Sequence, residues 1–226
     1  MLSAIFTKYR LYYQQVTCKN VLLNQYYNAM RPLLNQSIKH VPLLAIDLEM
    51  TGLDAQHDQI ISIGIMPILN GQIAIKQGQH KLIKIAGSVG QSATIHGVLD
   101  NDLEQAISLD EAIIWLLKKT IGSILIAHHA PLDMHFIEQA LFKQTKRVSR
   151  LFAIDTMHIE QQRLMRHQTI IKEGELRLDR CRNRYNLPNY EAHNALVDAL
   201  SCAELLLAQL SQMGEVDKIT VAELIR

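Results

Sequence analysis

Short apolar runs separated by turn residues dominate the first part of the chain after its basic start. Residues 43–46 and 60–69 are apolar runs of strand length. The pair Asn70-Gly71 directly after the second run is typical of a tight hairpin turn, because both turn positions need positive φ. Residues 72–76 and 81–85 then continue as further short strands. This part of the chain therefore predicts an antiparallel meander.

The second half of the chain predicts helices and strands in alternation. Ser108 and Glu111 form a capping box that opens an amphipathic helix reaching residue 119. Further strands are predicted at 124–127 and 151–154, and further helices from Pro131, from Asp155 and over the apolar stripe of 196–210. This order predicts an α/β fold with a mixed sheet, antiparallel in its first three strands and then extended by parallel strands, flanked by helices.

The beginning of the chain differs from the rest in charge. Residues 1–46 hold five basic residues and no acid, whereas the remainder holds 18 basic and 22 acidic residues. Apolar residues recur at helical spacing here and predict one or two amphipathic helices: Leu22, Leu23, Tyr26, Tyr27 and Met30. We expect this segment to dock on the domain or to contact nucleic acid or a partner. An organellar transit peptide, also basic and amphipathic, is a further interpretation.

The composition of the whole chain sets the broad class. With 226 residues, 48% of them hydrophobic, and a net charge of +1, the chain has enough apolar residues for a packed core. It contains no run of about 18 apolar residues, so a membrane span is not expected. The three cysteines lie far apart and form no CxxC pair, which argues against a disulfide framework and favours a reducing, cytoplasmic location.

Acidic residues stand where a buried strand should be apolar. Asp47 and Glu49 are two positions apart on the first predicted strand, so their side chains share a face. Neighbouring carboxylates raise each other's pKa, and a hard divalent cation such as Mg²⁺ or Mn²⁺ removes that penalty. Asp133 in a first helical turn and Asp198 in the last helix offer further oxygens. His193 precedes Asp198 by five residues, a spacing that favours a place for His193 in the preceding loop or in the first turn of the helix.

Five motifs follow one another along the chain. Residues 47–54 are DLEMTGLD, 94–97 are TIHG, 127–133 are AHHAPLD, 155–156 are DT and 193–199 are HNALVDA. In this order they resemble the DEDDh-type 3′–5′ exonuclease family, which includes the epsilon-subunit exonuclease domain of DNA polymerase III. The resemblance extends from about residue 43 to about residue 210.

The resemblance implies a ribonuclease H-like fold and a 3′–5′ exonuclease that uses two Mg²⁺ or Mn²⁺ ions. Such an enzyme acts on 3′ ends of single-stranded DNA or RNA, with DNA favoured, and releases nucleoside 5′-monophosphates. By family role, the ions are held by four carboxylates: Asp47, Glu49, Asp133 and Asp198. His193 is the implied general base, a task that suits the ordinary histidine pKa of about 6.5.

The resemblance also implies residues that contact the substrate: Met50, Thr51, Gly52, Leu53, His96 and His129. Ordinary pocket packing is the alternative interpretation of Met50 and Leu53, and a loop histidine without a chemical role is that of His96. His129 and Leu132 stand where the family motif has Asn and Phe, which predicts altered packing of the substrate. Segment 47–54 is similar to the oligoribonuclease branch and 94–97 to the epsilon branch, so a short-RNA nuclease is the alternative substrate assignment.

Together these observations predict three parts: a basic helical extension at 1–40, an exonuclease domain at 41–212 and a short tail at 213–226. Residues 143–184 carry eleven basic and five acidic residues, which fits either a cationic rim for a phosphate backbone or a solvated face. The rival from another class is a noncatalytic polymerase- or nucleic-acid-binding module, which has no need of these acids. Zinc is not expected. A polymerase partner, a homodimer and the pathway, DNA repair among others, are left open.

Overall fold

The computed structural model describes residues 2–88, 98, 103, 106–166, 170–191 and 193–225, with side chains from Ile5 onward. Its strands are β1 Leu43–Met50, β2 Ile60–Leu69, β3 Gln72–Ile73, β4 Gln79–Leu82, β5 Ile124–Ala127 and β6 Ala153–Asp155. They form one sheet in the order β3-β2-β1-β5-β6, with β4 also paired to β2. β1 pairs antiparallel with β2 and parallel with β5, and β5 pairs parallel with β6. The predicted mixed α/β sheet is confirmed.

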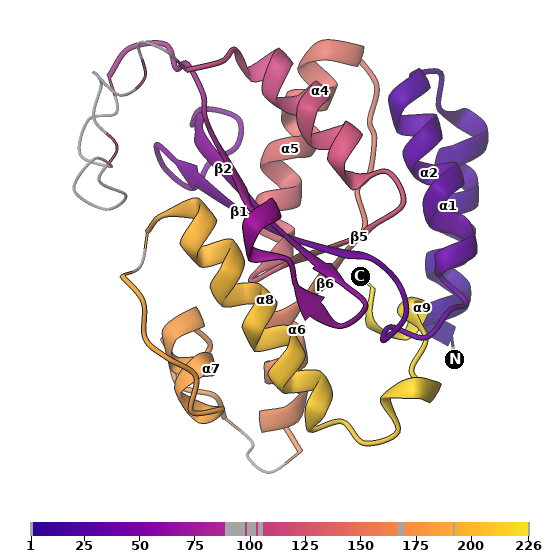
Figure 1. Ribbon diagram of the computed structural model, residues 1–226. Helices are drawn as coiled ribbons and strands as arrows, with labels where there is room; N and C mark the ends of the chain where they lie inside the picture. The colour runs from indigo at the N-terminus through magenta and orange to yellow at the C-terminus, as the bar shows by residue number, and fades with distance from the viewer. Residues whose placement is uncertain are drawn as a thin grey trace.

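Helices cover both faces of this sheet. The described helices are α1 Leu2–Thr17, α2 Val21–Leu33, α4 Leu109–Thr120, α5 Ala130–Thr145, α6 Thr156–Leu164, α7 Leu178–Arg184, α8 Ala195–Ser211 and α9 Val221–Leu224. Figure 1 shows α8 in front of the sheet, packed on β1 and β2, with α4 and α5 behind it. Among the described residues, every helix is too short or too polar to span a bilayer.

Several local predictions are confirmed by the backbone. Ser108 and Glu111 form the capping box of α4, and Asn70 and Gly71 both adopt positive φ in the turn after β2. The strand at 124–127 and the helix that follows Asp155 are also found where the sequence predicts them.

The predicted third strand is shorter than expected. It was expected over 72–76, but the ladder stops after Ile73 and a 3-10 helix, Ile75–Gln77, follows. Ala74 donates its amide to the Pro67 carbonyl at 2.9 Å. Because proline has no N–H, Pro67 cannot return a second hydrogen bond, and the pairing ends there.

The N-terminal helices pack into the main hydrophobic core. Leu23, Tyr26 and Tyr27 on α2 are fully buried in the same cluster as the strands. The Tyr26 hydroxyl donates to the Phe152 carbonyl at 3.3 Å and accepts the Phe152 amide at 3.1 Å. The end of the chain closes the same region, since α9 contacts α1 and Ile225 forms a β-bridge with Ile154. The segment before β1 is thus helical, as predicted, and closely packed.

Candidate active site

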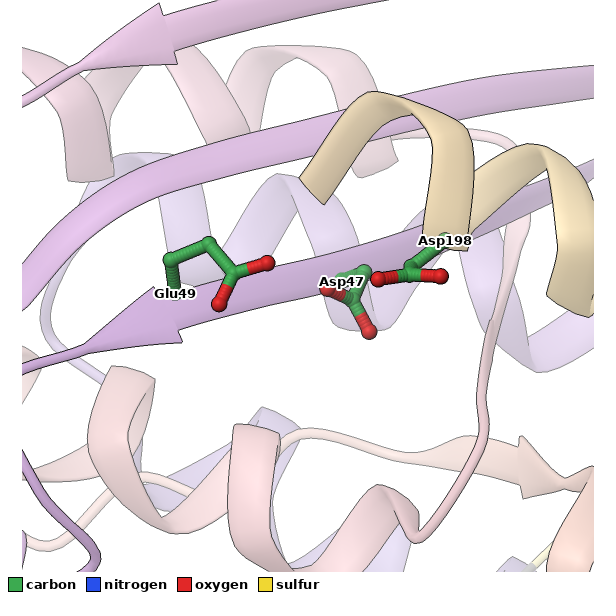
Figure 2. Close-up of side chains that lie close together, drawn as sticks. All are labelled: Asp47, Glu49 and Asp198. Carbon is green, nitrogen blue, oxygen red and sulfur yellow. The ribbon is translucent and has the colours of Figure 1, made fainter. Parts of the chain in front are cut away.

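Three carboxylates meet where β1 passes under the start of α8. Asp47 and Glu49 point from the same face of β1, and Asp198 reaches down from the first turn of α8 (Figure 2). One oxygen from each lies within 4.8 Å of the others. The strand alternation that the sequence predicts for Asp47 and Glu49 therefore produces a cluster of oxygen atoms.

The approach of α8 to the sheet depends on a glycine. Gly64 on β2 lies directly opposite Asp47 in the antiparallel register. A Cβ atom at Gly64 would overlap the backbone of Ala195, the first residue of α8. The absence of a side chain at this position lets the helix come down onto β2, which places Asp198 over β1.

Asp133 enters the same cleft from another element. It lies in the first turn of α5, whose second residue is Pro131, and it is 5% exposed. His129, the residue directly before the helix, adopts a left-handed backbone with φ 71° and donates its amide to Asp155 at 3.0 Å. This sharp turn after β5 aims the first turn of α5 at the carboxylate cluster.

The electrostatics of the cluster favour a cation. Burial, together with the charges of Asp133, Asp198 and Glu49, raises the pKa of Asp47 well above its usual range. Burial and the Asp198 charge raise the pKa of Glu49 to about 7, and burial likewise raises that of Asp133 and of Asp198. Without a counter-charge these groups resist ionisation together. Their all-oxygen donor set fits a hard divalent cation such as Mg²⁺ or Mn²⁺.

His193 lies at the rim of this cluster, outside α8. It has a left-handed backbone, with φ 72°, and an exposed side chain. Its amide donates to Asp198 Oδ2 at 2.7 Å. His193 therefore lies in the loop, one of the two places predicted from the five-residue spacing, and this hydrogen bond fixes the loop relative to a carboxylate of the cluster.

The cluster lies in an open cleft of about 1020 Å³. Of the residues predicted to contact substrate, Met50, Leu53 and His129 line it. Leu53 is 76% exposed, so its side chain is available to a ligand. His96 and the rest of segment 94–97 lie outside the described residues.

Thr51 and Gly52 lie in the loop between Met50 and Leu53, and their contact with the substrate stays a prediction. They are not among the residues that line the cleft. Thr51 donates its hydroxyl to Asp58 at 3.1 Å and accepts the amide of Gln59 at 3.0 Å. Gly52 approaches the Asp58 carboxylate so closely that a Cβ would overlap it. These two residues shape the loop after β1, and no sequence pattern indicates their contact with Asp58.

The wall opposite β1 comes from α7 and the loop after it, of which the sequence predicts only Arg177 and Arg182, as members of a basic stretch that fits a cationic rim. The lining residues from this part are Arg177, Leu178, Asp179, Arg182, Asn183, Asn189 and Tyr190. Arg182 is 3% exposed and binds three oxygens at 2.7 Å, the carbonyls of Ser201 and Pro188 and the carboxylate of Glu204. It thereby ties the loop that leads to His193 onto α8.

The basic stretch at 143–184 does not form one continuous rim. Arg163 and Arg184 pair with the buried Glu160, and Arg150 pairs with Glu138 at 2.6 Å. Of the basic residues in this stretch, only Arg177 and Arg182 line the cleft among the described residues. The contribution of this stretch to the cleft is therefore local.

His128 has a structural place beside the cleft. Its Nε2 lies 2.8 Å from the Leu176 carbonyl, and its Nδ1 lies 2.9 Å from the Thr156 hydroxyl. Because a carbonyl can only accept, Nε2 carries the proton. Both ring nitrogens are occupied, so His128 offers no free lone pair to a metal.

The chain matches the model of one protein family and is similar in sequence to part of several DNA polymerases. The model of a family described as exonuclease matches residues 44–206, more than half of the chain. The DNA polymerase III PolC-type of Thermotoga petrophila is 28% identical over 191 residues, which are 84% of this chain and 13% of the polymerase. The protein of the same name from Staphylococcus haemolyticus is 26% identical over 187 residues, 80% and 12% of the two chains. The chain therefore spans about an eighth of the length of these relatives.

Solved structures share the fold. Exonuclease X in complex with 5′ overhanging duplex DNA superposes with a TM-score of 0.59 at 21% identity, covering 80% of this chain and 98% of that one. The nuclease domain of 3′hExo, a DEDDh family member bound to rAMP, superposes with a TM-score of 0.62 at 13% identity, covering 81% and 96%. At these identities the likeness shows a common architecture.

Proposed function

The chain belongs to the exonuclease family, as its five motifs predict, and from that membership we propose a divalent-metal-dependent 3′–5′ exonuclease of single-stranded nucleic acid, DNA favoured. The observation that carries the proposal is the meeting of Asp47, Glu49 and Asp198 within 4.8 Å in an open cleft beside His193. Oligomers of RNA are the alternative substrate. The products are nucleoside 5′-monophosphates, because water attacks the phosphorus and the 3′ oxygen leaves.

The carboxylates have the first role in the proposed mechanism. Asp47, Glu49 and Asp198 would hold one cation, and Asp133 with Asp47 would hold a second. Bound divalent ions supply positive charge that stabilises both the attacking and the leaving oxygen. Before any ion binds, the raised pKa values of these groups let protons compete for the same oxygens. Metal affinity should therefore increase as the pH increases.

His193, Met50, Leu53 and His129 have the remaining roles. His193 takes the proton of the attacking water on a ring nitrogen, and its exposed side chain allows that proton to pass on to solvent. The hydrogen bond from the His193 amide to Asp198 keeps the loop that carries the imidazole beside the reacting phosphate. Met50 and Leu53 contact the terminal base, and His129 contacts the next part of the strand.

One degradation assay tests the proposal. Single-stranded DNA and RNA with either the 3′ or the 5′ end labelled are incubated with Mg²⁺, Mn²⁺ or a chelator. The wild type should shorten strands from the 3′ end only when metal is present, and the Asp47→Ala variant should be inactive. His193→Ala should lose most of the rate and still bind Mn²⁺ in calorimetry.

Each alternative gives a different result in that assay. Faster hydrolysis of short RNA than of DNA would assign the oligoribonuclease-like activity. Strand binding without hydrolysis under every metal condition would assign the noncatalytic module. A polymerase partner, a homodimer and a cytoplasmic location stay predictions, the first of which a pull-down with a replicative polymerase tests.

A further inference from the structure

The helix α1 presents apolar side chains on the face that points away from the core. Thr7 and Leu11 face inward and are buried, whereas Phe6, Tyr9 and Tyr13 on the opposite side are 61%, 66% and 57% exposed. Together with three exposed neighbours these form a surface that we call the aromatic stripe: Ile5, Phe6, Tyr9, Tyr12, Tyr13 and Val16. A helix on a globular protein normally turns polar residues outward. A contiguous apolar surface of this kind indicates a binding site.

The charges around the stripe select an anionic occupant. Residues 1–46 contain five basic residues and no acid. Arg10 lies over the Phe6 ring at 5.6 Å, and Arg31 lies over the Tyr12 ring at 5.5 Å. A second copy of the chain would bring these cations against one another. Four of the six stripe residues are aromatic, which suits the flat faces of nucleobases.

Arg10 also lines a small groove between α1 and the start of α5. The groove measures about 280 Å³ and includes Pro131, His135 and Arg150. Its one carboxylate, Glu138, binds Arg150 at 2.6 Å and accepts the Leu151 amide at 2.9 Å. Among the described residues no carboxylate forms an ion pair with Arg10. The groove is therefore cationic on its α1 side.

The groove lies next to the catalytic cleft. The first turn of α5 separates them, because His129 and Leu132 line the cleft while Pro131 and Met134 line the groove. Figure 1 shows α1 and α2 together at one side of the molecule, beyond the sheet. A strand that leaves the cleft over the start of α5 therefore meets Arg10 first and then the rings of α1.

We propose that the Arg10 groove and the aromatic stripe form a second binding segment for single-stranded nucleic acid, upstream of the 3′ end held in the catalytic cleft. This rests on the proposed function. Arg10 binds a backbone phosphate, and bases stack on Phe6, Tyr9 and Tyr13. These rings are about 4.5 to 6 Å apart along the helix axis, which allows one base of an extended strand per ring. The enzyme then prefers long strands to short ones, with little preference for sequence.

Binding measurements test this segment separately from catalysis. Labelled single strands of about 4 and about 20 nucleotides are titrated with protein in chelator, so that no hydrolysis occurs. Replacing Phe6, Tyr9 and Tyr13 together by Ala should weaken binding of the long strand at least about tenfold and leave the short strand unchanged. Arg10→Gln should reduce the dependence of log affinity on log salt by about 0.7 for the long strand, the value for one lost phosphate contact.

A matched control lies at the opposite edge of the sheet. Ile75 is 66% exposed and Lys76 is exposed beside it, in the 3-10 helix after β3. Replacing Ile75 by Ala and Lys76 by Gln removes one exposed apolar side chain and one charge, and should leave both affinities unchanged. If the triple variant does not fold, Tyr9→Ser alone supplies the measurement, since Tyr9 is the most exposed of the three rings.

The outcomes separate this proposal from the proposed function. Equal long-strand affinity in wild type and the triple variant overturns the proposal, whatever the activity. Loss of long-strand affinity with normal hydrolysis of the short strand supports both. A wild-type dimer that the triple variant converts to monomer, with strand binding unchanged, would assign the stripe to a second copy. Binding to phosphatidylserine vesicles that the variant loses, again with strand binding unchanged, would assign it to a lipid surface.

Discussion

At the scale of single residues, the site is a set of carboxylates that oppose one another until a cation binds. Asp47 lies among three other acids, and burial together with their charges raises its pKa. Repulsion alone would push these carboxylates apart. The packing of α8 against β1 holds them together. This opposition between packing and charge should be visible in the stability of the metal-free protein.

The metal-free protein should lose stability as the pH increases through the range in which Glu49 ionises. The ordinary pKa of 4.5 applies to Glu49 in the unfolded chain, and the folded value is about 7. Between these values the folded state keeps a proton that the unfolded state has released. Raising the pH from about 4.5 to about 7 therefore lowers the free energy of unfolding. Urea unfolding in chelator across this range measures the effect.

The Glu49→Gln variant isolates this contribution. It cannot ionise at position 49, so the stability difference between variant and wild type should grow in favour of the variant as the pH increases through the same range. Saturating Mn²⁺ should reverse the order, because the wild type alone keeps the full set of ligands. A wild type that gains stability relative to Glu49→Gln in chelator as the pH increases would contradict the assignment.

At the scale of elements, the close contact between α8 and β2 positions Asp198. Gly64→Ala should push α8 away from the sheet, because the new Cβ would overlap the Ala195 backbone. We expect a loss of stability of about 3 kcal/mol or more, together with weaker Mn²⁺ binding, measured by urea unfolding and calorimetry. Gly78→Ala is the comparison, since the atom nearest its Cβ is the flexible end of Met66, while the Ile75 carbonyl and the Leu196 side chain are 3.2 Å away. Unchanged Mn²⁺ affinity in Gly64→Ala would show that Gly64 does not position Asp198 for metal binding.

The connection from α7 to α8 should control the reaction rate through Arg182. Arg182→Lys keeps the charge but replaces the two guanidinium nitrogens that reach Ser201, Pro188 and Glu204 by a single ammonium nitrogen. We expect a destabilisation of about 3 kcal/mol and a lower kcat with unchanged Mn²⁺ affinity, because the loop before His193 becomes free. Arg180→Ala on the same helix, where the side chain is 67% exposed, should behave like wild type. Equal losses of kcat and of metal affinity in Arg182→Lys would point to general disruption instead.

Elements with strong local signals could be predicted, and those held by distant contacts could not. β1, β2 and β5 are apolar runs, and α4 has its own capping box, so each is readable from a few neighbouring residues. α7 has the sequence LDRCRNR, without an apolar stripe, and Arg182 holds it through partners on α8 and the following loop. The five proposed catalytic residues lie in motifs. Asp58 and Arg182 lie outside the motifs, and nothing in the sequence connects them to the residues that they contact.

At the scale of the whole molecule, the N-terminal helices and the catalytic fold share one core. The sequence predicts helical spacing in this segment, but the hydroxyl of Tyr26 binds the backbone of Phe152, 126 residues further along the chain. No local pattern indicates a contact at such a distance. The division at residue 40 stays a prediction, and the shared core suggests a test of whether the two parts unfold together.

Leu23→Ala should destabilise the entire molecule. Leu23 is fully buried on α2 in the core cluster that includes the strands, and removing such a side chain costs about 2–5 kcal/mol. Trp115 on α4 is the single tryptophan of the chain, so its fluorescence reports unfolding of the part after residue 40. If the core is one cooperative unit, Leu23→Ala shifts the Trp115 transition to lower temperature by the same amount as the circular dichroism transition. Tyr12→Ala, at a position 51% exposed on α1, should leave both transitions unchanged.

If Leu23→Ala leaves the Trp115 transition at the same temperature, residues 1–40 form an independent unit. Truncation would then separate the second strand-binding segment on α1 from catalysis.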